Sequence, residues 1–204
     1  MGVLDALIGF DVPTGKFFLI SHKYYMDSLH ELLVKRRSIR RYKEEPLDAE
    51  AVKLILEAGL MAPTSKNSRA WQFVAVDDKD MLQRLSQCKP AGAHPIAKAA
   101  LAVAVAVDAT KSEAWIEDAS AAASYMQLQA ADLGIGSCWI EVRDRYQVDG
   151  TPANEYVQEL LGIPEEISVV CILTFGYPDE ERRPCDTSKL HWENVHIGSY
   201  KAND

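Results

Sequence analysis

The sequence predicts a mixed α+β domain, in which helices and strands intermingle along the chain. Apolar residues recur at helical spacing in several segments, while other short segments are continuously apolar, as buried strands are. The connections between these segments are too irregular for a doubly wound parallel sheet. No Gly-x-Gly-x-x-Gly pattern follows a predicted strand, which argues against a Rossmann dinucleotide site.

Two helices are predicted in the first third of the chain. The first begins at Ser28, which can form a capping box with Glu31. The second begins at Asp48, a favourable cap, and ends before Pro63, which cannot continue a helix. Apolar residues complete both patterns: Leu29, Leu32 and Leu33 in the first, and Val52, Ile55, Leu56 and Leu60 in the second.

The rest of the chain mixes strands with helices. The apolar runs predict strands at 71–76, 99–107, 136–142 and 169–175. A short helix is expected after Asp78, a long alanine-rich helix over 112–133 and a further helix over 151–161. The long helix is expected to be buried, either in the core of one chain or at a subunit interface. The polar tail after residue 178 offers only Trp192 and Tyr200 as anchors.

Bulk composition limits the partners of the chain. Its 204 residues carry a formal net charge of -8, which argues against nucleic acid because phosphate backbones need a broad basic face. The longest apolar run, 99–107, is too short to span a bilayer, so no membrane partner is expected. The four cysteines and five histidines lack metal-ligand spacing. We therefore predict a cytoplasmic protein with reduced thiols and no metal.

A basic segment, residues 35–42, stands out in this acidic chain. Arg36, Arg37, Ser38 and Arg40 can converge on one phosphate, because arginine offers a planar fork of donors and serine a short one. The alternative is a solvated basic run at a helix end, where cations complement the helix dipole.

A second segment, residues 62–73, brings small and polar residues together before a tryptophan and a strand-like run. With the basic segment, and in this order, it resembles the FMN-dependent nitroreductase family. Residues 36–40 match an Arg-Arg-Ser-x-Arg-like motif, and residues 62–67 match an Ala-Pro-Ser-Ser-x-Asn-like motif. Arg69 and Ala70 depart from the usual Gln-Pro. Residues 133–141 match a Leu-Gly-Leu-Gly-Ser-like helix end and the segment that follows it.

The resemblance implies a nitroreductase-like α+β fold with a central, mainly antiparallel sheet flanked by helices. It also implies a homodimer with FMN at the subunit interface. The FMN phosphate is expected on Arg36, Arg37, Ser38 and Arg40, with a C-terminal cation that is Lys189, Arg182 or Arg183. The side chains expected to reach the other subunit's flavin are those of Pro63, Thr64, Ser65 and Asn67.

The backbone of Ile140 and Glu141 is expected near the flavin N5, and no side chain is predicted to be a covalent catalyst. The implied reaction passes electrons from NADH or NADPH through FMN to a nitro-aromatic, a quinone or a similar small acceptor, by ping-pong hydride transfer. A same-fold dehalogenase or azoline oxidase is an alternative, and so is a flavin-binding protein without turnover. Which nicotinamide is preferred, and whether Arg69 affects substrate choice, stays open.

The resemblance begins at about Met26. Residues 1–25 are predicted to be an extension outside the catalytic unit, which is residues 26–204. These first residues lack the basic and apolar regions of a signal peptide.

Overall fold

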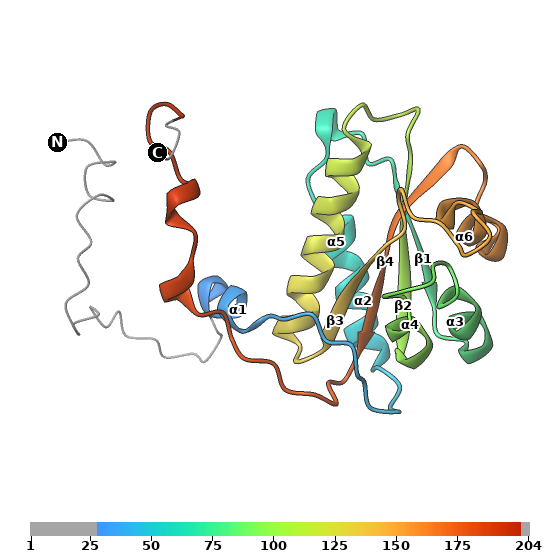
Figure 1. The fold of residues 1–204 in the computed structure, drawn as a ribbon, viewed down its shortest axis with the longest axis horizontal. Helices are drawn as coiled ribbons and strands as arrows, with labels where there is room; N and C mark the ends of the chain where they lie inside the picture. The colour runs from blue at the N-terminus through green and yellow to red at the C-terminus, as the bar shows by residue number, and fades with distance from the viewer. Residues whose placement is uncertain (1–27, 201–204) are drawn as a thin grey trace.

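The computed structural model describes residues 28–200 of the chain, and the predicted extension at 1–25 lies outside them. Its helices are α1 (Leu29–Lys35), α2 (Ala49–Leu60), α3 (Lys79–Leu85), α4 (Pro95–Lys98), α5 (Trp115–Asp132) and α6 (Ala153–Leu161). Short 3-10 turns are η2 (Ser65–Asn67), η3 (Thr187–Lys189) and η4 (Trp192–Asn194). Figure 1 shows how these elements surround one sheet.

The sheet has four strands in the order β1-β2-β4-β3. They are β1 (Trp71–Val76), β2 (Leu101–Asp108), β3 (Gly136–Glu141) and β4 (Ile167–Gly176). Every neighbouring pair is antiparallel, as the resemblance implied. All four predicted strands are present, with ends that differ by at most two residues from the prediction. Because β3 comes last in the strand order, it is an edge strand, and one side of its backbone faces away from the sheet.

Helices cover both faces of the sheet. α2 and α5 lie on one face, and α3, α4 and α6 lie on the other (Figure 1). Because side chains alternate along a strand, β2 divides between the two cores. Its valines at 103, 105 and 107 pack with α2 and α5, while its alanines at 102, 104 and 106 pack with the opposite layer. The mixed α+β prediction is confirmed.

The alanine-rich helix is buried within one chain. The buried positions of α5 include Ala119, Ala122, Ala123 and Ala130. Its approach to α2 is close, because a Cβ added at Gly59 would lie 2.2 Å from the Met126 side chain. Packing against α2 and the sheet thus accounts for the small residues of this helix.

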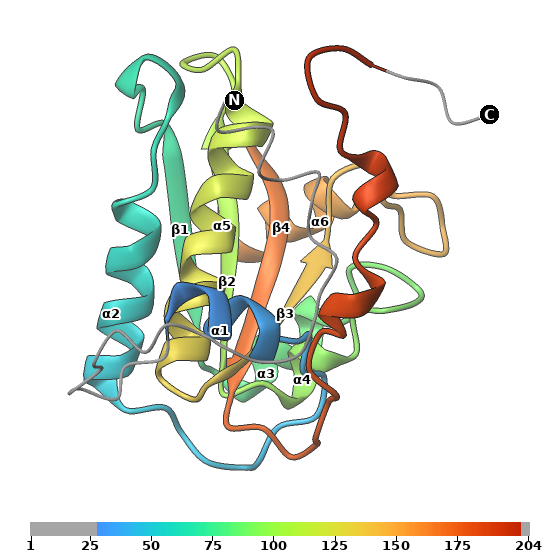
Figure 2. The ribbon, with the colours of Figure 1, turned by 90° about the vertical axis from the view of Figure 1, so that its left-hand side faces the viewer.

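The chain after β4 leaves the domain as a C-terminal arm, residues 178–200, which carries η3 and η4 beyond α1 (Figures 1 and 2). The expectation that Trp192 and Tyr200 anchor this tail is wrong for the single chain, since they are 64% and 80% exposed. An arm that extends away from the domain offers these rings no core to enter. The short helix α1 also has no buried residue, although its predicted capping box between Ser28 and Glu31 is formed.

Candidate functional site

The basic segment lies along the edge of the sheet. The Ile39 N–H donates to the Ser137 carbonyl at 2.9 Å, and Tyr42 pairs with Pro178 just after β4. Ile39 and Tyr42 are both buried, which fixes the segment, whereas Arg40 and Arg41 between them are exposed. The close approach needs glycine at 136, because a Cβ there would lie 2.8 Å from the Ile39 Cβ.

Tyr42 ties the segment to β4 from within. Its hydroxyl donates to the Ile39 carbonyl at 2.5 Å and pairs with the Thr174 hydroxyl at 2.7 Å. Burial raises the pKa of Tyr42 well above its ordinary value, so the phenol stays neutral and serves as an anchor.

A hollow of about 200 Å³ opens beside the segment, and we call it the basic hollow. Four cations line it: Lys35, Arg36, Arg37 and Arg182. The Arg37 side chain is held by its donation to the Arg183 carbonyl at 2.9 Å and to the Arg36 carbonyl at 3.0 Å. Such a convergence of guanidinium groups suits a phosphate group.

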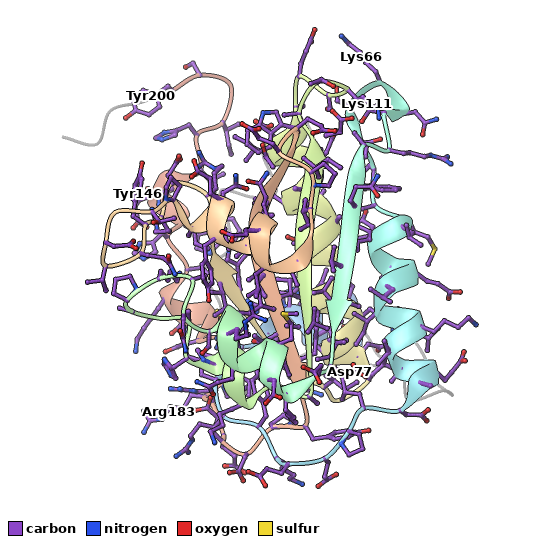
Figure 3. The ribbon with its side chains drawn as sticks, turned by 90° about the vertical axis from the view of Figure 1, so that its right-hand side faces the viewer. Lys66, Asp77, Lys111, Tyr146, Arg183 and Tyr200 are labelled. Carbon is purple, nitrogen blue, oxygen red and sulfur yellow. The ribbon has the colours of Figure 1, made fainter. Side chains whose placement is uncertain are left out.

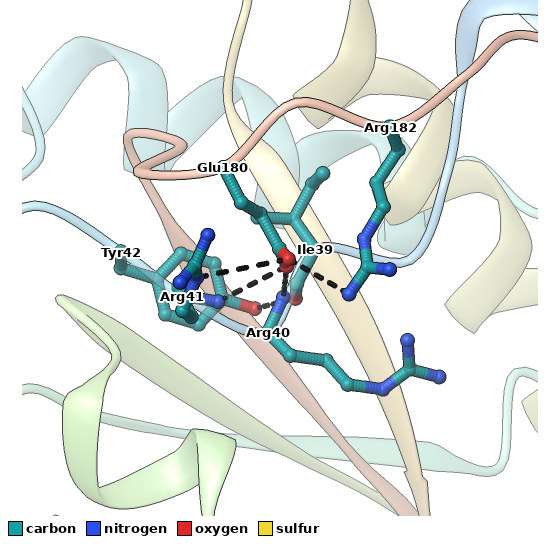
Figure 4. A network of polar contacts seen from close by, with 6 residues as sticks. All are labelled: Ile39, Arg40, Arg41, Tyr42, Glu180 and Arg182. Carbon is teal, nitrogen blue, oxygen red and sulfur yellow. Dashed lines mark hydrogen bonds and ion pairs between the residues drawn. The ribbon is translucent and has the colours of Figure 1, made fainter.

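A carboxylate that no sequence motif marks, Glu180, holds the same region together. The Glu180 side chain is 6% exposed and accepts the backbone N–H groups of Arg40 at 2.6 Å and Arg41 at 3.3 Å. It also pairs with Arg182 at 2.7 Å (Figure 4). The backbone hydrogen bond from Arg40 is the main cause that lowers the Glu180 pKa, with help from Arg182. Glu180 thus joins the C-terminal arm to the basic segment as an anion.

Of the three candidate C-terminal cations, Arg182 lines the basic hollow with Arg36 and Arg37. Arg183 contributes its backbone carbonyl to Arg37. Lys189 lies further along the arm, where it pairs with Asp186 at 3.1 Å and its side chain is 80% exposed. A role for Lys189 in phosphate binding stays a prediction. Ser38 and Arg40 lie on the same strip of chain, next to β3 and Glu180 respectively.

Along the outer edge of β3, beside the basic segment, some backbone N–H and C=O groups point away from the sheet. Antiparallel pairing alternates, so residues whose backbone faces β4 alternate with residues whose backbone faces away. The Val142 N–H donates to Val170 on β4, whereas the Ser137 carbonyl accepts from Ile39 outside the sheet. The Glu141 N–H therefore points outward. The Ile140 N–H faces its partner Ile172 on β4, so Glu141 is the better placed of the two predicted backbone groups.

The second predicted segment forms a strained loop, residues 62–70, after α2. Lys66, Asn67 and Arg69 all have positive φ, at 50°, 55° and 47°, an uncommon conformation for side-chain-bearing residues and one often found at functional sites. The Arg69 Nε donates to the Asn67 side chain at 2.9 Å. Pro63 and Asn67 are exposed, and Thr64 and Ser65 are half-buried.

Asp118 in the first turn of α5 holds this loop. Its carboxylate accepts the Ser65 N–H at 2.7 Å, the Ser68 hydroxyl at 3.0 Å and the Ser112 hydroxyl at 2.7 Å. It is 4% exposed. Asp118 was not among the predicted site residues, because a carboxylate in the first turn of a helix is commonly explained by the helix dipole alone.

The two predicted halves of the site do not meet in one chain. Asp118 and the 62–70 loop lie at the start of α5, while Gly134, at the other end of α5, lines the basic hollow. A helix of 18 residues is about 27 Å long. Lys66 and Arg183 accordingly lie at opposite ends of the molecule (Figure 3).

Other chemistry is limited among residues 28–200. No group of three His, Cys, Asp or Glu side chains there can hold a metal ion. No described helix is long and apolar enough to cross a membrane. Burial raises the pKa of the Cys138 thiol, which makes it a poor nucleophile.

Comparison with known proteins places this geometry in context. The model of the nitroreductase family matches residues 33–177. A protein of Archaeoglobus fulgidus, provisionally named an NADH dehydrogenase/NAD(P)H nitroreductase, is 34% identical over 161 residues, which cover 77% of this chain and 89% of that protein.

Two solved structures are also similar. An FMN-dependent nitroreductase from Clostridium difficile R20291 has a TM-score of 0.81 and 46% identity, over 83% of this chain and 98% of that chain. A provisionally named nitroreductase from Desulfovibrio desulfuricans in complex with FMN has a TM-score of 0.62 and 27% identity, over 79% of this chain and 95% of that chain.

Proposed function

Because the chain belongs to the nitroreductase family, we propose that it is an FMN-dependent oxidoreductase that takes electrons from NADH or NADPH and passes them to a small acceptor. The observation that carries this proposal is the basic hollow beside the open edge of β3. These two features offer cations for a phosphate and outward N–H groups for the edge of a planar ring.

The donor set fits FMN. Arg36, Arg37 and Arg182 supply guanidinium groups at the hollow, and Ser38 and Arg40 follow on the same strip. When bound, FMN supplies the two-electron chemistry. The chain itself then needs to bind the phosphate, orient the ring and leave one ring face open.

The Glu141 N–H is the group we assign to the flavin N5 region. It is a fixed backbone donor at the edge of β3. A donor that is already oriented stabilises charge that develops near it without reorganising. The Glu141 carboxylate accepts the Trp139 indole N–H at 2.9 Å, so its side chain is engaged within β3.

We assign the 62–70 loop to the flavin of a second copy of the chain. The length of α5 separates this loop from the basic hollow, so Pro63, Thr64, Ser65 and Asn67 cannot complete the site of their own chain. Exposed apolar side chains support a homodimer, because large apolar groups in water favour burial at an interface. Six of these side chains lie on the C-terminal arm and α1: Leu29, Leu33, Leu190, Trp192, Val195 and Tyr200.

For the acceptor we propose a nitro-aromatic or a quinone, reduced by ping-pong exchange at the open ring face. Donor and acceptor would then bind in turn at one place. The oxidised nicotinamide leaves before the acceptor enters.

The first test is the visible spectrum of the purified protein, followed by mass identification of any released chromophore. We expect a flavin spectrum and release of FMN on denaturation. NADH or NADPH should bleach that spectrum, and a quinone or nitro-aromatic should restore it. A protein that cannot be reconstituted with FMN would overturn the proposal. Flavin that neither nicotinamide reduces would leave a carrier without turnover. Light scattering of the same sample tests the homodimer.

A further inference from the structure

Lys89 contacts the outer edge of β3 at the end opposite to the Ile39 contact. It lies on the loop between α3 and α4, and its Nζ donates to the Glu141 carbonyl at 2.8 Å. That carbonyl belongs to the residue whose N–H we assign to the flavin. The ammonium group of Lys89 is therefore a neighbour of the proposed ring site.

Two contacts bracket the open part of the β3 edge. At one end the Ile39 N–H donates a hydrogen bond to the Ser137 carbonyl, and at the other end the Lys89 ammonium group donates one to the Glu141 carbonyl. The alternation of the strand places the N–H groups of Trp139 and Glu141 on the same outward side. A planar ring set against this edge would lie between the arginines and Lys89.

The surroundings of Lys89 act on its charge in both directions. The side chain is half-buried, and burial lowers the Lys89 pKa, as does the nearby Arg145, whereas Cys88 and Glu141 act to raise it. Its hydrogen-bond partner is a neutral carbonyl. A groove of about 540 Å³ opens at this position, and its lining includes Lys89, Gln87, Gln147 and Asp149. A cation held beside open space at low solvation favours an anionic ligand group.

We propose that Lys89 contacts the bound flavin and favours its reduced form over its oxidised form. This inference rests on the proposed function. A hydride carries two electrons and one proton, so its transfer from the nicotinamide adds one negative charge to the flavin and leaves the nicotinamide one charge more positive. A neighbouring ammonium group attracts the more negative form. The Arg36–Arg182 end of the site binds the phosphate, which is present in both forms, and does not discriminate in this way.

The test compares dissociation constants of oxidised FMN and of chemically reduced FMN for the wild type and for Lys89→Met. We expect Lys89→Met to raise the dissociation constant of reduced FMN about tenfold more than it raises that of oxidised FMN. Tenfold corresponds to a midpoint potential about 30 mV more negative for a two-electron couple. Lys89→Arg should keep most of the wild-type ratio, because it keeps the charge. Lys98→Met, on α4, removes an exposed lysine outside this edge and is the matched control.

A purely structural role for Lys89 predicts equal weakening of both forms. Equal weakening, or no change, in Lys89→Met would overturn the inference. If Lys89→Met does not fold, Lys89→Gln keeps a donor for the Glu141 carbonyl without the charge, and the same shift in ratio is expected. Failure of the wild type to bind FMN at all would overturn the proposed function. Normal FMN binding with an unchanged ratio would overturn only the role of Lys89.

Discussion

The Glu180 carboxylate accepts the Arg40 backbone N–H at 2.6 Å and so fastens the start of the C-terminal arm to the basic segment. The same carboxylate pairs with Arg182, one of the cations of the basic hollow. Its charge therefore sits among the groups expected to bind a phosphate. If the main effect of Glu180 were to repel the phosphate, removing it would tighten FMN binding. If its main effect is to hold the arginines in position, removing it would weaken FMN binding.

Glu180→Ala should lower the free energy of unfolding by about 1–3 kcal/mol, because two backbone donors and Arg182 lose their acceptor. We also expect weaker FMN binding, since the arginines lose their fixed positions. Denaturant unfolding and FMN titration measure the two effects. Glu181→Ala, on the neighbouring exposed residue, is the control. Tighter FMN binding in Glu180→Ala would show that the carboxylate acts mainly as a repulsive charge.

The pH dependence of stability follows from the lowered Glu180 pKa. A carboxylate whose pKa is lower in the folded state stabilises the fold fully above its ordinary pKa and loses this contribution as pH falls through the folded value. The Arg40 backbone hydrogen bond and Arg182 are the causes here. Stability of the wild type should therefore fall more steeply than that of Glu180→Gln below about pH 4.5. Urea titrations at several acidic pH values measure this. If the unfolding free energies of the two proteins fall in parallel with pH, Glu180 does not cause the acid sensitivity.

Arg36→Ala should weaken FMN binding by roughly ten- to a hundred-fold. Removal of one hydrogen bond to a charged group costs about 1.5–3 kcal/mol, and each 1.4 kcal/mol is a factor of ten. Fluorescence titration of the apoprotein measures this, with the exposed Arg84→Ala on α3 as control. Unchanged affinity would place the phosphate away from the basic hollow.

Sequence patterns predicted the elements well where the signal was local. The four strands follow from apolar runs, and the caps Ser28 and Asp48 begin their helices as predicted. The long helix starts at Trp115 and not near Ser112, because the Ser112 hydroxyl donates to Asp118 and stays outside the helix.

The site was predicted less completely, because its supporting contacts join distant residues. Glu180 meets Arg40 across 140 positions of the chain, and Asp118 meets Ser65 across 53. Carboxylates of this kind look like ordinary surface residues in a sequence. The motif residues were recognisable, but the residues that hold them became visible only once the chain was folded.

Asp118→Ala should loosen the 62–70 loop. Three donors lose a buried acceptor, so we expect a loss of about 2–4 kcal/mol in unfolding free energy. If the loop serves the flavin of the second copy, FMN binding should also weaken while the dimer persists. Asp132→Ala, at the other end of α5 and exposed, is the control. Loss of stability with unchanged FMN affinity in the dimer would separate the loop from the flavin site.

Gly136→Ala tests whether the basic segment must lie against β3. The added Cβ would meet the Ile39 Cβ at 2.8 Å, so truncating Ile39 to alanine would not relieve the contact and the segment must shift. We expect a loss of about 1–3 kcal/mol in stability, typical of overpacking, and weaker FMN binding as the arginines move. Gly59→Ala is the contrasting variant, because its closest contact is the flexible end of Met126, and neither residue lines the basic hollow. Thermal unfolding and FMN titration of both variants decide the matter: if Gly136→Ala binds FMN as the wild type does, close contact between the basic segment and β3 is not needed for the cofactor.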